Sequence, residues 1–182
     1  MDESSRKGLF GELIFLNQVM DNGRPALPAV QGWVGPDGAD QDFVYDGCWQ
    51  EVKTVGISAD SITISSLEQL NTESSGEIVV MRVDKCAPQH ADARSLAEEV
   101  DLTIERVSSD SDALTLLENK LSKYGYIDLP EYREQKYHYS GRERFNVDDG
   151  FPRLTSANVP AQVTAAQYSI SLVGIAAWKL EE

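Results

Sequence analysis

The segment from Asp42 to Lys53, which reads DFVYDGCWQEVK, constrains the fold of this chain more than any other stretch. Its central dipeptide, Asp46-Gly47, is the strongest short signal for a two-residue turn and predicts a β-hairpin. Side chains alternate across a strand, so Glu51 and Lys53 point to the same face of the return strand. Strands seldom bury Glu or Lys unless the two are paired. The hairpin therefore predicts a polar site on a sheet.

Carboxylates on the two strands of this hairpin give it the character of a metal site. Asp42 directly precedes the apolar strand residue Phe43, and Glu51 lies on the return strand. Clustered acids create a site for a hard divalent cation, and a lysine beside them can contact a phosphate or a water. Asp40 competes with Asp42 as a ligand, and we prefer Asp42 because it stands directly at the strand.

An ordered set of motifs around the hairpin resembles the PD-(D/E)xK nuclease superfamily. The aspartate, the ExK triplet and a glutamate on an early helix, Glu12, carry the resemblance to the superfamily as a whole. An uncharacterised bacterial family within it is similar to this chain over most of residues 8–175, in the motifs GLFGE (8–12), W-x-GP (33–36), DF (42–43), EVK (51–53), ISSxxQL (64–70) and GFPR (150–153). The superfamily's proline before the aspartate is absent, since Gln41 stands there.

The resemblance implies a metal-dependent endonuclease that hydrolyses DNA phosphodiester bonds in bacterial restriction or phage defence, with Mg²⁺ or Mn²⁺ as its cofactor. The catalytic residues that it implies are Glu12, Asp42, Glu51 and Lys53. Asp42 and Glu51 would ligate the metal with the Val52 carbonyl, and Glu12 would ligate it through water or bind a second metal. Lys53 would stand near the attacking water or the scissile phosphate, where an amine can act as a general base. A lone helix glutamate is commonly a solvated residue, and that interpretation of Glu12 stays open.

Three further residues are expected to contact nucleic acid. Ser66 and Gln69 open a predicted helical turn after a strand, where a hydroxyl and an amide can hold a phosphate or orient the Lys53 amine. A plain helix N-cap at Ser66 is an equally good interpretation. Arg153, in the rigid GFPR turn, is expected to anchor a carboxylate or a phosphate.

The net charge of −14 at pH 7 opposes the nuclease interpretation, because DNA-binding surfaces are usually basic. Some basic residues do cluster towards the C-terminus, at Arg133, Lys136, Arg142, Arg144 and Arg153. Two alternatives stay open: a catalytically inactive nuclease-fold binding module of a defence complex, and an acidic DNA-mimic or regulatory protein. A lack of Mg²⁺ or Mn²⁺ binding would favour the binding module, whereas a strongly basic surface patch would count against mimicry.

Length and composition are those of one soluble globular domain spanning residues 1–182. Cys48 and Cys86 do not make a disulfide framework, and no apolar run approaches the length of a membrane span. We therefore expect a cytoplasmic protein that binds no membrane. Its expected partners are DNA, other proteins of a defence system and, in a homodimer, a second copy of the chain.

The predicted fold class is α/β, with a central mixed sheet of four or five strands flanked by helices, as in restriction endonucleases, and additional C-terminal strands. Helices are expected from Ser4 or Ser5 to about Met20, over 95–100 and over 110–123, while 102–107 either extends the second helix or forms a strand. The remaining expected elements are strands over 43–45, 48–54, 61–65, 77–83 and 168–173, a loop over 24–40, and a hairpin within 131–149 that turns at Ser140-Gly141.

Overall fold

The computed structural model of the chain describes residues 1–71 and 74–181. Its α-helices are α1 (Glu3–Asp21), α2 (Ala26–Gln31), α3 (Leu96–Val107), α4 (Ser111–Tyr124) and α5 (Glu131–Glu134), and its 3-10 helices are η1 (Gly35–Asp37) and η2 (Ala176–Trp178). Its strands are β1 (Phe43–Tyr45), β2 (Cys48–Val55), β3 (Ser61–Ile64), β4 (Gly76–Cys86), β5 (Arg94–Ser95), β6 (Lys136–Val147) and β7 (Tyr168–Ser171). Among the described residues, no helix combines the length and the apolarity that crossing a membrane requires.

The central sheet has five strands in the order β1-β2-β4-β6-β5. Strands β2 and β4 are parallel, whereas β1 with β2, β4 with β6, and β5 with β6 are antiparallel. The predicted α/β fold with a mixed central sheet flanked by helices is thus confirmed. The predicted C-terminal strand also forms, but β7 lies outside this sheet and pairs with β3 in a separate two-stranded sheet.

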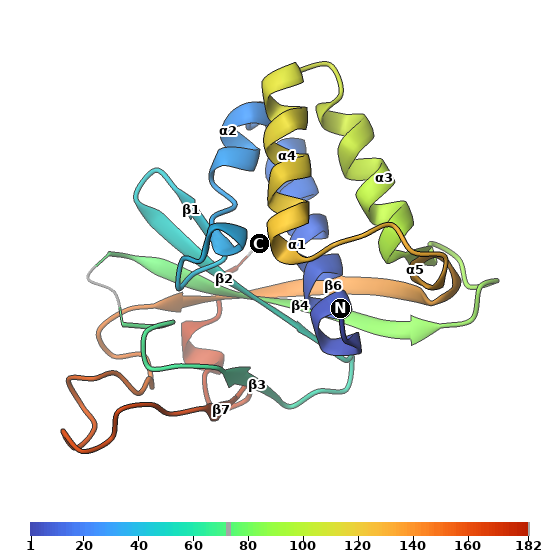
Figure 1. Cartoon of the computed structure of the whole chain (residues 1–182). Coiled ribbons are helices and arrows are strands. Elements are labelled where there is room, and N and C mark those ends of the chain that lie inside the picture. Colours follow the sequence, from blue (N-terminus) through green and yellow to red (C-terminus); the bar gives the residue numbers. More distant parts are fainter. Residues whose placement is uncertain (72–73, 182) are drawn as a thin grey trace.

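The two faces of the central sheet each cover a hydrophobic core. Helices α1 to α4 lie over one face, while β3, β7 and the C-terminal segment lie against the other (Figure 1). On β4, Val79 and Met81 belong to the core under the helices, and Ile78 and Val80 belong to the other core. A strand buried on both faces is apolar at consecutive positions, which explains the run IVVM within the sequence EIVVMRV.

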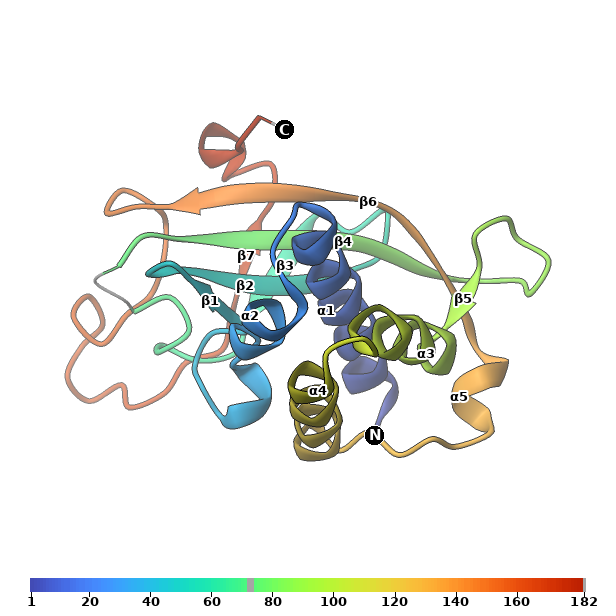
Figure 2. The same cartoon turned by 90° about the horizontal axis from the view of Figure 1, so that it is seen from above.

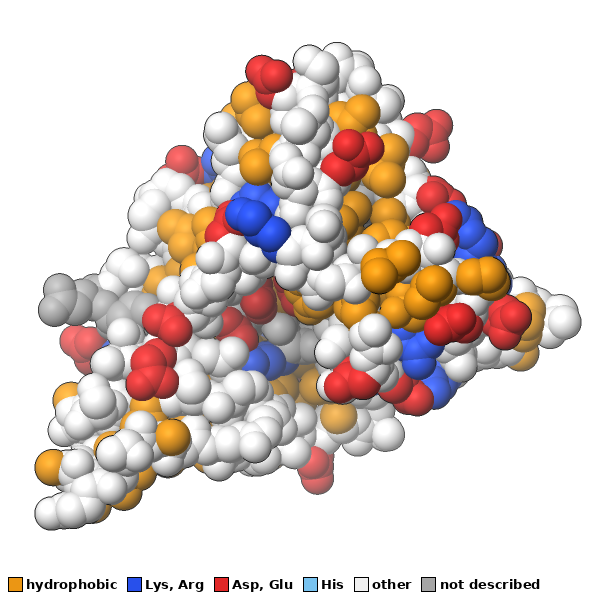
Figure 3. Space-filling model, viewed as in Figure 1, with side chains coloured by type: hydrophobic (Ala, Val, Ile, Leu, Met, Phe, Trp, Pro, Cys, Tyr) orange, Lys and Arg blue, Asp and Glu red, His pale blue; other side chains and the backbone are white. Residues whose placement is uncertain are grey.

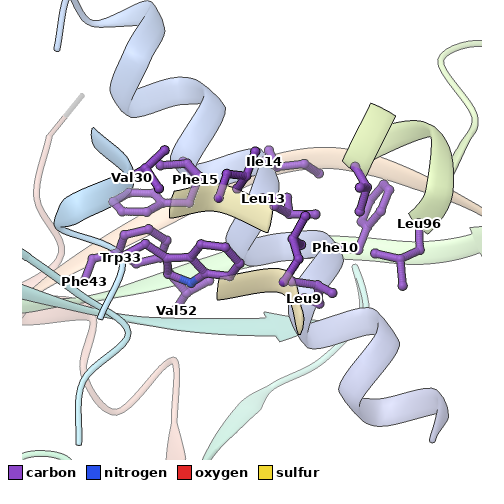
Figure 4. Packing of buried hydrophobic residues seen from close by; sticks show 14 of the residues in the cluster. Leu9, Phe10, Leu13, Ile14, Phe15, Val30, Trp33, Phe43, Val52 and Leu96 are labelled. Atoms are coloured by element: carbon purple, nitrogen blue, oxygen red, sulfur yellow. The ribbon is translucent and has the colours of Figure 1, made fainter. Parts of the chain in front are cut away.

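Helix α1 is the main cover of the sheet and runs across β2 and β4 (Figure 2). Its residues Leu9, Leu13 and Leu16 are fully buried, and they pack with aromatic rings from the segments before and within β1 (Figure 4). Trp33 and Phe43 supply two of these rings, with centroids 6.3 Å apart. The helix is therefore held on the sheet by the same segment that leads into the hairpin.

The predicted hairpin is present, and its turn explains its register. Asp46 and Gly47 both have positive φ, of 52° and 80°, as a type I′ turn requires, so Tyr45 pairs with Cys48. Strand β1 contains three residues and β2 contains eight. The second half of β2 therefore extends beyond its hairpin partner, and this is the edge where Asp42 lies.

Two predictions about the N-terminal third were wrong. The cap of α1 is Asp2, whose side chain accepts a hydrogen bond from the Ser5 amide over 2.7 Å, and not Ser4 or Ser5. The segment 24–40 is not simply a loop, because it contains α2 and η1. Pro25 occupies the N-cap of α2, a place where the missing N–H of proline removes no helical bond.

The hairpin expected within 131–149 is also wrong. Residues 136–147 form one continuous strand, β6, which pairs with β4 along its length. Gly141, with φ of 137°, lies where the register shifts between Arg82 and Val83, so the Ser140-Gly141 signal marks a bulge and not a turn. Residues 102–107 extend the second predicted helix and do not form a strand. Helix α3 begins after a capping box at Ser95 and continues to Val107.

Candidate active site

A cavity of about 530 Å³ opens between the start of α1, the free half of β2, and β3. Figure 3 shows a hollow between the helices and the β3/β7 sheet, with acidic side chains inside it. The structure brings most of the predicted site residues to its lining, namely Glu12, Asp42, Glu51, Val52, Lys53 and Gln69. Glu12 comes from α1, Asp42 from the bend before β1, Glu51 to Lys53 from β2 and Gln69 from a turn after β3, so the site exists only in the folded chain.

A glycine places α1 close enough to β2 to aim its glutamate at this cavity. A Cβ atom built on Gly11 would lie 1.9 Å from Thr54 Oγ1, which is far inside van der Waals contact. Only glycine fits at such a helix–strand crossing. The next residue, Glu12, therefore lies where the helix meets the strand that carries Glu51 and Lys53.

The Glu12 carboxylate is buried, with 6% of the residue exposed, and is held by two donors. The Trp33 indole Nε1 donates to Oε2 over 2.7 Å, and the Tyr124 hydroxyl donates to Oε1 over 2.7 Å. Burial raises the pKa of Glu12 well above its ordinary value, and the nearby Asp42 carboxylate raises it further. The solvated-helix interpretation of Glu12 is excluded by this burial.

Asp42 is fixed through both its backbone and its side chain. Its Oδ2 accepts a hydrogen bond from the Val52 amide over 2.7 Å, and its carbonyl accepts bonds from the Val34 and Gly35 amides over 2.8 and 3.0 Å. Burial raises the pKa of Asp42 to about 6, and the Val52 bond and Lys53 oppose that rise. The N–H and C=O of one strand residue point to the same side of the strand. The Val52 carbonyl therefore points to the same side as the Val52 amide, which is the side of Asp42.

Glu51 and Lys53 form the predicted pair on one face of β2. Lys53 Nζ lies 2.7 Å from Glu51 Oε1, and Gln69 joins them by donating to Glu51 over 2.9 Å and accepting from Lys53 over 3.2 Å. Burial, followed by repulsion from Asp42, raises the pKa of Glu51 to about 8. Glu51 Oε2 is buried and has no hydrogen-bond partner among the described residues.

Of the three residues expected to contact nucleic acid, one lies in the cavity and two lie outside it. Gln69 lies in the cavity, as described above, and its side chain also accepts from the Ser65 amide over 2.8 Å. Ser66 and Arg153 do not line the cavity. The Ser66 hydroxyl accepts from the Glu68 and Gln69 amides, which is a capping role, although the segment forms a turn and not the expected helical turn. Arg153 donates to the Leu70 carbonyl over 2.6 Å and lies 4.0 Å from an Asp149 oxygen.

The donor set of this cavity suits a hard cation bound through few protein ligands. Three mutually repelling carboxylates face one another in a desolvated space, and Glu51 Oε2 is an orphaned acceptor. Within the described part of the chain, no three His, Cys, Asp or Glu side chains are close enough together to hold a metal ion by themselves. Mg²⁺ typically uses one or two carboxylates and keeps several waters. Asp42, Glu51 and the Val52 carbonyl would therefore suffice, with Glu12 acting through water.

Several residues of the site were not predicted from the sequence. Trp33 belongs to the W-x-GP motif, but nothing in that motif indicates that its indole fixes Glu12. Tyr124 lies 112 residues from Glu12 in the chain, so no local pattern links them. Lys120, buried on α4, donates to the Trp33 carbonyl and pairs with Asp37 over 2.7 Å. An unusual lysine inside the apolar stripe of a helix is the signal that would have pointed to this network.

The remaining missed residues line the cavity on either side of the carboxylates. They are Ser4, Lys7 and Gly8 on α1, Thr54 and Val55 on β2, Ser61 and Thr63 on β3, and Ser65 and Gln167 beside β3. The alternation of hydroxyl and isoleucine in SITIS was the available signal, because it predicts one polar face on this strand.

Of three comparisons with known proteins, the one with family models found a match. The model of the family described as "Putative PD-(D/E)XK family member, (DUF4420)" matches residues 1–173. The match includes the helix of Glu12 and the hairpin that carries Asp42, Glu51 and Lys53. A comparison with curated proteins and one with solved structures found no match.

Proposed function

This chain belongs to the PD-(D/E)XK family DUF4420, and on that premise we propose that it is a metal-dependent endonuclease that hydrolyses DNA phosphodiester bonds. The observation that carries the proposal is the pairing of Glu51 and Lys53 on one strand, beside Asp42, in a cavity that also contains the Glu12 carboxylate. Buried acids that repel one another destabilise the folded protein, and such clusters are typical of functional sites. A divalent cation bound between them would relieve this repulsion.

The chain itself would position the groups that act on the phosphate. Asp42, Glu51 and the Val52 carbonyl would hold Mg²⁺ or Mn²⁺, which when bound supplies an activated water and neutralises charge on the phosphate. Lys53 lies beside Glu51 and would contact the scissile phosphate or take a proton from water. Gln69 keeps the Lys53 amine and the Glu51 carboxylate in a fixed relation, because it bonds to both. Trp33 and Tyr124 fix Glu12 in the same way.

Metal-dependent cleavage assays with matched variants test this proposal. With Mg²⁺ or Mn²⁺ the chain should cut plasmid, branched or single-stranded DNA, and Ca²⁺ should support binding without cleavage. The variants Glu51→Gln and Lys53→Met should lose about 10²–10⁴-fold in rate, whereas Glu118→Gln and Lys179→Met, outside the cavity, should cut like the wild type. Full activity in both cavity variants would reject the proposal.

One alternative has its own supporting observation. The net charge of −14 suits a nuclease fold that is retained as a protein-binding module. Titration calorimetry separates the two functions, because the nuclease must bind Mg²⁺ or Mn²⁺ and lose that binding in Asp42→Asn. If the folded wild type shows no heat of Mg²⁺ or Mn²⁺ binding, the binding module is favoured.

The cellular setting is part of the proposal and comes from the family resemblance. We place the activity in bacterial restriction or phage defence, with other defence proteins as partners and a homodimer as a further arrangement. Sedimentation of the purified chain, alone and with DNA, measures whether it dimerises.

A further inference from the structure

We propose that this site takes a single strand of DNA in preference to intact duplex, and that the strand lies between α1 and a row of hydroxyl groups on β3. This rests on the proposed function of the same cavity and names its substrate class. The two walls of the cavity and the burial of its carboxylates support this substrate class.

The first wall is the polar face of β3, continued by Ser65 directly after the strand. Thr63 and Ser65 are exposed and line the cavity. The alternate residues Ile62 and Ile64 are buried in the hydrophobic core on the side of the central sheet away from the helices. Alternate strand residues are about 6.4–6.8 Å apart, so their hydroxyls form a regular row along the cavity. Serine and threonine hydroxyls are common donors to phosphate oxygens. Ser61 continues the row, although its hydroxyl already contacts Asp60 over 3.1 Å.

The second wall is the first turns of α1. Lys7, which is half-buried, and Ser4 line the cavity from this side. Lys7 and Lys53 are the cations among the cavity's lining residues. A strand between the walls would therefore meet one amine on the wall and another beside the carboxylates. The other donors of the lining, including Gln167, are uncharged.

The depth of the carboxylates favours one strand over two. Glu51 is 2% exposed and Glu12 is 6% exposed. The cavity of about 530 Å³ lies in the range of roughly 300–1,000 Å³ that is typical of small-molecule sites. A short piece of one strand can bend into such a space. The backbone of an intact double helix stays attached to a body much wider than the cavity, so its phosphates approach the carboxylates less readily than those of a single strand.

The charge of the protein favours the same substrate. Affinity for duplex depends strongly on counterion release by many Lys and Arg residues. Here Arg133, Lys136 and Arg144 are engaged with acidic side chains, and none of them lines the cavity. Hydrogen bonds from hydroxyls to one backbone depend less on net charge.

Fluorescence anisotropy with the wild-type chain in Ca²⁺ tests the substrate class directly. The probes are one labelled oligonucleotide as a single strand and the same sequence annealed to its complement. We expect the single strand to bind at least about tenfold tighter, equivalent to about 1.4 kcal/mol. Equal affinity, tighter duplex binding, or binding of neither probe would overturn the proposal.

Matched variants assign the two walls. Lys7→Gln should weaken single-strand binding and lower the salt slope of log K by about 0.7, the value per phosphate for single strands. Thr63→Val keeps the shape of the side chain and should weaken binding about three- to tenfold with an unchanged slope. Lys179→Gln and Thr115→Val, outside the cavity, should bind like the wild type. Wild-type binding by both cavity variants would refute the placement of the strand.

The same preparations separate this inference from the nuclease proposal. If the single strand binds as expected but Mg²⁺ produces no cleavage, the nuclease proposal fails and the binding inference stands. If Mg²⁺ supports cleavage of duplex as fast as of single strand, the nuclease stands and this inference fails.

Discussion

The Trp33 indole donates a hydrogen bond to Glu12 over 2.7 Å, so a residue of the segment before β1 fixes the carboxylate of α1. The same tryptophan is fully buried and stacks near Phe43 at the start of the hairpin. Its ring therefore joins the packing of the core to the geometry of the site. Losing the indole N–H, without losing the aromatic ring, separates these two roles.

Trp33→Phe should destabilise the chain by about 1–3 kcal/mol, because a buried carboxylate oxygen loses its donor. The loss should also raise the pKa of Glu12 further, since the hydrogen bond from Trp33 lowers it. Urea denaturation measures the stability, and the pH profile of cleavage should move to higher pH. Trp49→Phe is the matched control, because Trp49 donates to the Ser74 carbonyl in the other core. It should leave the pH profile unchanged, and a profile shifted equally in both variants would contradict the role given to Trp33.

Lys120 supports this arrangement from α4. It is 3% exposed, donates to the Trp33 carbonyl and pairs with Asp37, which also pairs with Lys123. Lys120→Met should cost about 1–3 kcal/mol of stability, because a buried carbonyl and a carboxylate lose a donor. Lys123→Met should cost less than about 1 kcal/mol, since that pair is exposed. Urea denaturation of the two variants checks the order, and equal losses would show that Lys120 does not support Trp33.

Gly11 determines how closely α1 approaches β2. Gly11→Ala gains about 1 kcal/mol of helix propensity, but its Cβ would lie 1.9 Å from Thr54 Oγ1. Overpacking of this kind costs about 1–3 kcal/mol, so the clash should outweigh the propensity. We expect lower stability and weaker Mg²⁺ binding as Glu12 moves with the helix.

A double-mutant cycle identifies the cause of the Gly11 effect. Thr54→Ala removes the closest atom and should restore part of the stability that Gly11→Ala loses. If the two changes simply add, the contact between this helix and strand does not explain the loss.

The central part of the fold was predictable from local signals. Asp46-Gly47 determines the hairpin, and the period-2 pattern then puts Glu51 and Lys53 on one face whatever the rest of the chain does. The run from Glu77 to Val83 is mostly apolar on both faces, so a central strand was the natural interpretation. These signals depend on neighbours in sequence, which one chain displays directly.

The failures concern signals whose meaning depends on distant partners. Ser140-Gly141 favours a turn in isolation, but pairing with the full length of β4 turns it into a bulge. Tyr124 completes the Glu12 site only because α4 packs beside the segment that carries Trp33. Propensity cannot reveal such contacts, since tertiary packing decides them.

The carboxylates of the cavity should make the metal-free chain less stable as pH rises. Burial raises the pKa of Asp42 to about 6, and burial with repulsion from Asp42 raises that of Glu51 to about 8. The folded chain therefore keeps protons that the unfolded chain has released. By linkage, the stability from these groups is fully present below about pH 4 and is lost as pH rises through about 8. Thermal melts in chelator should show this decline, and saturating Mg²⁺ should reduce it because the cation binds the ionised acids.

Two aspartates with opposite pKa shifts provide the control for this prediction. Asp42→Asn removes a carboxylate whose pKa is raised, so it should stabilise the metal-free chain at high pH and flatten the decline. Asp37→Asn removes a carboxylate whose pKa is lowered by Lys120 and Lys123, so it should destabilise the chain above about pH 4. Melting temperatures of both variants across the pH range test the pair. If Asp42→Asn lowers stability at high pH as Asp37→Asn does, the ionised Asp42 carboxylate is not destabilised by its burial, and the case for a cation in this cavity is lost.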